Sequence, residues 1–312
     1  MSDNYPNGSN WERETLHQLA LASVKEQRRS RQWGIFFKSL GFLYLFVVLF
    51  YVTGWSEGSS ASVEHTALID INGVIGSDDV VNADTVIASL KSAYDSKGTK
   101  GIILRINSPG GSPVQAGMIN DEIKRQRKLH PNIPVYAVVQ DICASGGYYI
   151  AVAADKIYVD KASIVGSIGV LMDGFGFTGV MEKVGVERRL MTAGSNKAML
   201  DPFSPVNPKH KEFAQQMLDQ IHAQFITVVR EGRGKRLKET PETFSGLFWS
   251  GESSVEMGLA DAFGSSDYVA REVIKQENLV DFTAKEGLAD RFAKRLGASV
   301  SASFLGKKFG LE

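Results

Sequence analysis

The sequence predicts an α/β protein with a mainly parallel sheet and crossover helices, preceded by one N-terminal transmembrane helix. Beyond residue 63, apolar β-branched runs alternate with segments of helical spacing. This alternation is typical of parallel strands joined by crossover helices. Ahead of them, residues 35–55 are apolar and contain a single charged residue, Lys38. At about 1.5 Å per residue, a helix of that length spans a hydrocarbon core of roughly 30 Å.

The composition is that of a globular protein. The chain has 312 residues, of which 43% are hydrophobic and 22% are charged. Lysine plus arginine and aspartate plus glutamate both number 35, so the balanced charge gives no electrostatic reason to expect nucleic acid as a partner. The one cysteine, Cys143, excludes an intramolecular disulfide and a multi-cysteine metal site.

The N-terminal region predicts a membrane anchor. Residues 1–33 are polar and end in a basic cluster, and residues 34–55 are the predicted transmembrane segment, with Trp33 and Trp55 as interfacial residues at its ends. The basic flank places residues 1–33 in the cytoplasm and the rest of the chain outside, by the positive-inside rule. We therefore expect a single-pass topology.

A cleavable signal peptide is the alternative for this region. Residues 59–61, Ser-Ser-Ala, fit a cleavage site of small residues. The polar region ahead of the apolar segment is long for a signal peptide, so an uncleaved anchor is favoured. Residues 56–65 are then a short linker.

The elements expected beyond the linker alternate along a domain that spans residues 66–276. Strands are predicted at 66–75, 101–106, 133–139, 156–159, 163–170 and 186–192. Helices are predicted at 80–94, 115–129, 147–154, 208–230 and around 253–258. Residues 277–312 show no clear period, and we expect them to form a C-terminal tail.

The other elements are organised around residues 141–154. An apolar run ends there in small residues, and Ser145 lies where a turn becomes a helix. The start of a helix presents unpaired N–H groups and the positive end of the helix dipole, which suits an oxyanion. Taken alone, Ser145 is more often explained as a helix cap, because serine is favoured at that position.

A second turn, residues 107–112, contains the consecutive glycines Gly110 and Gly111. Two glycines allow backbone N–H groups to face a ligand at close range. An ordinary strand-to-helix turn explains them as well. If both turns lie at the carboxyl edge of one sheet, where open α/β sheets bind ligands, they supply the two sets of donors that an oxyanion hole needs.

A nucleophilic serine needs a base, and no histidine lies in a turn that the sheet aims at Ser145. The five histidines are His17, His65, His130, His210 and His222. A Ser-His-Asp triad is therefore weakly supported. A desolvated, neutral lysine serves the same purpose. Lys197, in the loop 192–203, is one such residue, but spacing alone does not distinguish it from Lys183 or Lys161.

Several motifs in order resemble those of the signal peptide peptidase A (protease IV) family of serine peptidases, in its short single-copy form. The matching segments are Asn107-Ser-Pro-Gly-Gly111, Ala144-Ser-Gly-Gly-Tyr148, and residues 155–159, 166–170 and 193–203. The resemblance covers about residues 67–261 and implies a crotonase-like or Clp-protease-like fold. This chain departs from the family at Ser195, where members often have another lysine.

The resemblance also implies the roles of individual residues. Ser145 is then the nucleophile and Lys197 the general base, while Ser167 orients the lysine amine. The expected oxyanion donors are Gly110, Gly111 and Gly146. No metal or organic cofactor is implied. Short members are expected to form a homo-oligomeric ring, and the sequence leaves open whether Lys197 meets Ser145 within one subunit or reaches the Ser145 of a neighbour.

These inferences predict a membrane-anchored serine endopeptidase with a Ser-Lys dyad. We expect it in the bacterial inner membrane, with its catalytic domain on the periplasmic side, where it degrades cleaved signal peptides and other short apolar peptides. Two alternatives keep the fold and change the function. One is a crotonase-type acyl-thioester enzyme, and the other is an inactive membrane-anchored scaffold that binds other membrane proteins.

Overall fold

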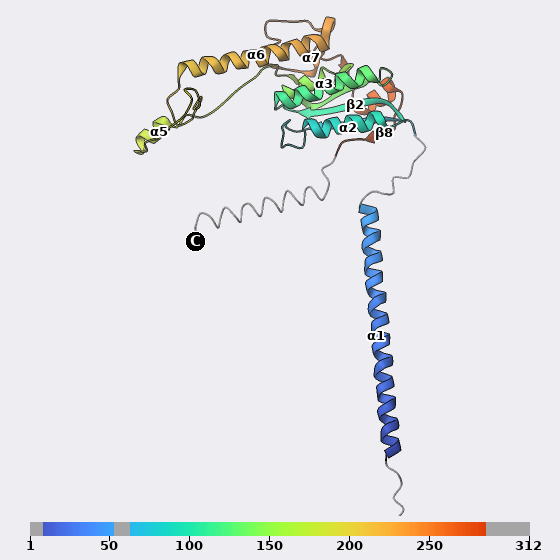
Figure 1. The fold of residues 1–312 in the computed structure, drawn as a ribbon. Coiled ribbons are helices and arrows are strands. Elements are labelled where there is room, and N and C mark those ends of the chain that lie inside the picture. The colour runs from blue at the N-terminus through green and yellow to red at the C-terminus, as the bar shows by residue number, and fades with distance from the viewer. Residues whose placement is uncertain (1–8, 53–62, 285–312) are drawn as a thin grey trace, which may run out of the picture. The chain divides into compact units, whose positions relative to one another are not determined.

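A computed structural model describes residues 9–52 and 63–284 (Figure 1). The chain divides between residues 61 and 62 into two compact units. The first contains one helix, α1, which runs from Ser9 to Val52. Within it, Glu14–Phe50 is the one stretch of the described residues that is long and apolar enough to cross a membrane. The helix therefore begins well inside the segment predicted as polar, and residues 53–62 lie outside the described part.

The second unit is built on an eight-stranded sheet. Six strands follow the order β6-β5-β3-β2-β1-β8, β4 pairs with β3, and β7 pairs with β4. The strands are β1 His65–Asn72, β2 Thr99–Ser108, β3 Val135–Ala144, β4 Lys156–Val159, β5 Ile164–Gly166, β6 Phe248–Ser250, β7 Ala262–Phe263 and β8 Leu279–Asp281. The pairing of β5 with β6 is antiparallel, and the other strand pairs are parallel. The predicted fold class, α/β with a mainly parallel sheet, is confirmed.

Helices connect the strands and cover the sheet. They are α2 Ala83–Asp95, α3 Pro113–Leu129, α4 Gly146–Ala151, α5 Thr178–Lys183, α6 Pro208–Arg233, η1 Gly234–Arg236, α7 Gly251–Glu256, α8 Ser266–Tyr268 and the π-helical turn η2 Val269–Ile274. Figure 1 shows α2 and α3 running beside each other along the sheet. Asn82 starts α2 as a capping box, because its side chain accepts the Thr85 N–H and the Thr85 hydroxyl accepts the Asn82 N–H.

The central strands are buried on both faces, which explains their continuous apolar runs. Ile69 and Leu104 lie in the main core, on the face that α2, α3 and α4 cover. Leu68 and Ile103, which directly precede those two residues, lie in a smaller core with residues of η2 on the other face of the sheet. Because both faces bury apolar side chains, the strand signal in the sequence is strong but does not alternate.

Two expectations about the elements are wrong. Residues 186–192, which the sequence predicted as a strand, form no strand. The strand that pairs with β5 on the side away from β3 is β6 instead. Strand β8 falls inside the predicted tail and pairs with β1, so the sheet extends past residue 276. These strands have three residues each, and so short a run carries no pattern of its own. The remainder of the predicted tail, 285–312, lies outside the described residues.

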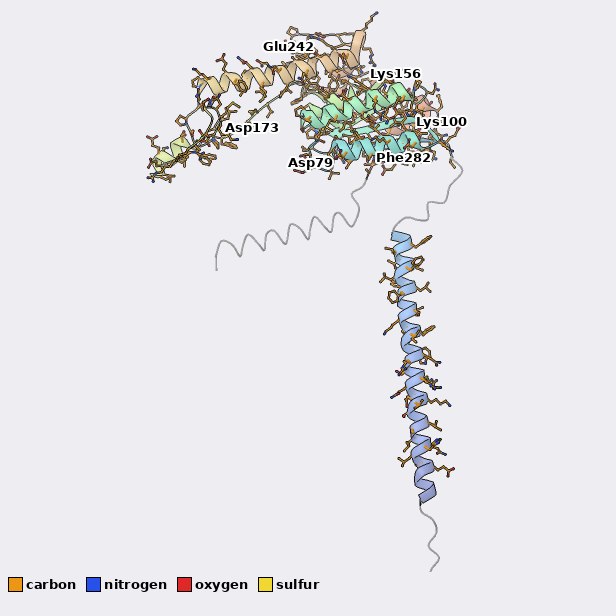
Figure 2. All side chains as sticks on the ribbon, in the orientation of Figure 1. Asp79, Lys100, Lys156, Asp173, Glu242 and Phe282 are labelled. Atoms are coloured by element: carbon orange, nitrogen blue, oxygen red, sulfur yellow. The ribbon has the colours of Figure 1, made fainter. Side chains whose placement is uncertain are left out.

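A long excursion leaves the sheet after β5. Residues 171–206, which we call the arm, contain α5 and return to the body at α6. Figure 1 shows α5 well away from the sheet, and Figure 2 shows Asp173 in this same region. Most arm side chains are exposed, including many apolar ones, among them Leu171, Phe175, Val180, Met191 and Val206.

Candidate active site

Ser145 lies between the end of β3 and the start of α4, with a backbone conformation that is rare for a residue with a side chain. Its φ is 51° and its ψ is −121°. Such a conformation costs on the order of 1–3 kcal/mol and persists only when the surroundings enforce it. Here the Ser145 N–H donates to the Gly166 carbonyl at 2.8 Å, and the Ser145 carbonyl accepts the Tyr149 N–H at 2.9 Å.

The Ser145 hydroxyl is not used as a helix cap. Ser145 occupies the cap position of α4, yet its side chain makes no capping hydrogen bond. The interpretation of this serine as a structural cap is therefore wrong for its side chain. Ser145 instead lines a cavity together with Gly146, the first residue of the helix.

The two glycines of residues 107–112 pack directly against this turn. Gly110 has a φ of 106°, and a Cβ on it would lie 2.7 Å from the Ser145 Cβ. Gly111 has a φ of 145°, and a Cβ there would clash with the Ile75 carbonyl oxygen. The loop is held at the end of β1 because Ile75 N–H donates to the Gly110 carbonyl at 2.9 Å. Glycine is required at both positions by conformation and by close approach.

The three expected oxyanion donors are not equivalent. The Gly110 N–H donates to the Ser108 hydroxyl at 3.2 Å, so it is already used within the loop. Gly111 and Gly146 both line the cavity at Ser145. The Gly111 nitrogen lies 3.2 Å from the position that a Cβ on Gly146 would occupy. The geometry thus favours Gly111 and Gly146 over Gly110 as the pair of donors.

The cavity beside Ser145 has a volume of about 520 Å³. Its lining includes the apolar or aromatic side chains of Tyr149, Val170, Leu171, Ile221 and Phe225. The rings of Tyr149 and Phe225 pack with centroids 5.0 Å apart. The buried Asn120 donates from its side-chain amide to the Tyr149 carbonyl at 2.7 Å, which holds the end of α4 against α3. The cavity is therefore shaped for an apolar group next to the serine.

Ser167 lines the same cavity. Its φ is 52°, another left-handed value for a residue that is not glycine. Its N–H donates to the Leu247 carbonyl at 2.7 Å. The preceding residue, Gly166, accepts the Ser145 N–H, so the two serines are joined through the β3–β5 pairing.

Lys197 is not brought to Ser145 within one chain. It lies exposed in the turns of the arm, where its N–H donates to the Gly194 carbonyl at 3.1 Å. It is not among the residues that line the cavity. Of the other two lysines considered, Lys183 is also in the arm, and the Lys161 amine lies 5.8 Å from the centre of the Phe263 ring.

The hydrogen bonds of the described residues join no histidine to Ser145. His65 is buried, with its ring bonded to the Val63 carbonyl and the Thr99 hydroxyl. His210 bonds Asn196 in the arm. His222 is closer to the site than the sequence predicted, because its Nε2 lies 3.1 Å from the Ile168 carbonyl oxygen. Its neighbours on α6, Ile221 and Phe225, line the cavity, but amphipathic spacing alone gave no indication of that.

Cys143, two residues before Ser145, is excluded as the nucleophile. It is fully buried in the main core. Burial raises the pKa of its thiol far above the ordinary value, so the reactive thiolate is not formed at neutral pH. Within residues 9–52 and 63–284, no group of three or more acidic, histidine or cysteine side chains is arranged to hold a metal ion.

Comparisons with known proteins identify the family of this chain. The family model for peptidase family S49 matches residues 127–280. A putative signal peptide peptidase SppA of Enterococcus faecium is 30% identical over 256 residues, which cover 80% of this chain and 72% of that protein. Protease 4 of Haemophilus influenzae is 31% identical over 219 residues, which cover 69% of this chain and 35% of that protein. The resemblance drawn from the sequence motifs is confirmed.

One similar protein has a different kind of name. The Na(+)/H(+) antiporter NhaA of Brucella melitensis is 45% identical over 175 residues, which cover 56% of this chain. The chain spans only 24% of the length of that protein. Most of the antiporter lies outside the match, so ion transport does not follow from this similarity.

Proposed function

This chain belongs to peptidase family S49, and on that premise we propose that it is a serine peptidase anchored in a membrane. The observation that carries the proposal is the conformation of Ser145. Its φ is 51°, its side chain makes no capping hydrogen bond, and it lines a cavity together with Gly111 and Gly146. A serine that serves only the fold gains nothing from such strain.

The proposed reaction uses Ser145 as the nucleophile. Its oxygen attacks a peptide carbonyl while a neutral lysine amine, that of Lys197, removes the proton. The N–H groups of Gly111 and Gly146 stabilise the oxyanion. The lysinium then protonates the departing amine, which breaks the peptide bond and leaves an acyl-enzyme. Water, deprotonated by the same lysine, releases the second product.

The lysine has to come from a neighbouring subunit in this proposal. Lys197 lies in the arm, away from the cavity of its own chain. The arm exposes large apolar side chains, with 79% of Phe175 and 94% of Met191 accessible. Exposed apolar patches of this kind favour association. A homo-oligomeric ring of copies would cover these side chains and deliver Lys197 to the next Ser145.

Short apolar peptides are the substrates that fit the cavity. Its apolar wall accepts an apolar side chain beside Ser145, and α1 would hold the site close to a bilayer. Signal peptides left in the membrane after secretion have this character, and the Enterococcus relative is named as a putative signal peptide peptidase. We place the catalytic domain on the periplasmic side of a bacterial inner membrane.

Mixing two inactive variants tests the proposal. Ser145→Ala and Lys197→Ala should each abolish hydrolysis of an apolar peptide, and co-assembled mixtures should regain activity by pairing an intact serine with a neighbour's intact lysine. Full activity of Ser145→Ala would refute the peptidase assignment. Inactive mixed rings, with both variants present, would place the dyad within one subunit. Lys161→Ala and Lys183→Ala are the matched controls, and we expect both to remain active.

A further inference from the structure

A three-residue turn, residues 167–169, contributes Ser167 and Gly169 to the lining of the cavity at Ser145. The Gly169 N–H donates to the Ser167 carbonyl at 2.9 Å, which closes a γ-turn centred on Ile168. The Ile168 side chain is fully buried in the main core. The turn also carries the left-handed φ of Ser167, so it is strained at one position and tightly closed at the next.

The carbonyl of the central residue has a partner from α6. The His222 Nε2 lies 3.1 Å from the Ile168 oxygen. A carbonyl oxygen only accepts, so Nε2 carries the proton and donates it. His222 is half-buried, with cavity-lining residues at positions 221 and 225 of the same helix. The donor is therefore fixed by a helix that also forms part of the cavity.

The turn has two connections to the proposed chemistry. Its first residue is Ser167, and the residue before that, Gly166, accepts the N–H of Ser145. The arm that contains Lys197 begins two residues after Gly169. The turn therefore connects the residue that contacts Ser145 to the start of the arm.

We infer that His222 is a positioning residue for the Ser-Lys chemistry. By holding the Ile168 carbonyl, its Nε2–H keeps the Ser167 hydroxyl at the cavity, where it orients the amine of the incoming Lys197. His222 itself exchanges no proton with the substrate. This inference rests on the proposed function, because it requires Ser167 to act on the lysine.

A double-mutant cycle between His222 and Ser167 tests the inference. The four forms are the wild type, His222→Leu, Ser167→Ala and the double variant, assayed as full chains on one apolar peptide. We expect His222→Leu to lower kcat about tenfold, equivalent to about 1.4 kcal/mol in the barrier, with little change in KM. Because both residues act through one hydroxyl, the double variant should be no slower than Ser167→Ala alone.

Conservative variants separate positioning from folding. Gln places an amide N–H near the position of Nε2, so His222→Gln should restore most of kcat, whereas the shorter Asn should not. Gln220→Leu, on the exposed side of α6, is the matched control and should keep full activity. Thermal unfolding and oligomer size should be equal across the set.

Two results would overturn the inference. One is a double variant whose loss equals the product of the two single losses, which would show that His222 acts independently of Ser167. The other is a His222→Gln enzyme as slow as His222→Leu. Neither result touches the proposed function, which fails only if Ser145→Ala remains active or the wild type hydrolyses no peptide.

Discussion

The Ser145 turn and the arm differ in how completely one chain builds them. Around Ser145, the backbone is held by the hydrogen bond to Gly166 and by contact with Gly110 that only glycine allows. In the arm, Lys197 is exposed, and the apolar side chains near it face solvent. The arm is held to itself by local contacts such as the ion pair between Arg188 and Asp201, at 3.0 Å.

This difference indicates which parts of the proposed site one chain positions by itself and which part it does not. The proposed nucleophile and oxyanion donors are preorganised because they lie on strand ends of one sheet, which a folded chain already positions. Lys197 lies on a segment whose apolar side chains are largely exposed among the described residues. In the proposed function, a second copy of the chain supplies both the cover for these side chains and the base.

Of the changes that test this comparison, replacing the proposed nucleophile should have the largest effect on kcat. We expect Ser145→Ala to lower kcat by about 10⁶-fold, the scale seen when a serine peptidase loses its serine. The fold should be unchanged, because the Ser145 hydroxyl makes no capping hydrogen bond. Hydrolysis of a fluorogenic peptide measures the loss, and circular dichroism checks the fold.

Disrupting the arm should produce the next largest effect. In Phe175→Asp combined with Met191→Asp, charge replaces two of the most exposed apolar side chains of the arm. We expect the oligomer to dissociate and kcat to fall by about 10²–10⁴-fold, the contribution of a general base. Light scattering with activity measures both, and a dissociated yet fully active chain would contradict the role given to the arm.

A methyl group added at Gly110 tests the other region of the comparison, the Ser145 turn, and should lower activity. In Gly110→Ala the new Cβ meets the Ser145 Cβ at 2.7 Å and the backbone keeps an unfavourable φ of 106°. Displacing the oxyanion donors should cost about 10²–10³-fold in kcat. Gly117→Ala is the control, since a Cβ there meets nothing within 4 Å and alanine favours the helix α3. Equal activity of both variants would show that close packing at Gly110 is not needed.

The smallest effect that we expect is a pH dependence of stability. Asp261 is buried, which disfavours its charged form, but the hydrogen bond and charge of Arg233 hold its pKa below the ordinary value. The stabilisation is therefore complete above the unfolded pKa, about 4, and is lost as the pH falls below it. Thermal unfolding from pH 7 to pH 3 should show a smaller decrease for Asp261→Asn than for the wild type.

Contacts of Arg233 and its neighbours connect the Arg233–Asp261 ion pair to α4, the helix that follows Ser145. Its guanidinium is buried and donates to the Gly258 carbonyl and to Asp261, both at 2.8 Å. The neighbouring carbonyl of Leu259 accepts the hydroxyl of Tyr148, a residue of α4, at 2.7 Å. If acid lowered the unfolding temperature of Asp261→Asn and of the wild type equally, another carboxylate would account for the loss of stability at low pH.

Much of the fold was predictable because its central elements are long and apolar. Strands β1, β2 and β3 and helices α3 and α6 coincide with the segments that the sequence predicted. The three-residue strands β6 and β8 were missed because their pairing depends on β5 and β1 rather than on their own residues. The segment 186–192 was misassigned because its β-branched residues belong to the exposed arm.

The candidate site was predictable in its residue types and less so in its detail. Ser145, Gly111, Gly146 and Ser167 do lie together at one cavity. That the Gly110 N–H is used by Ser108 depends on the path of the loop, which no spacing reveals. His222 was considered but not placed near the site, because helical periodicity identifies the face of a helix but not the carbonyl that the face meets.

By itself, the sequence determined that a serine and a glycine pair each follow an apolar strand and precede a helix, because apolar patterning and turn residues are local properties. Only the tertiary structure decided which N–H groups remain free and that Lys197 stands apart from Ser145 in its own chain. The physical reason is that hydrogen-bond partners and the course of a long connection are settled by contacts between segments distant in the chain.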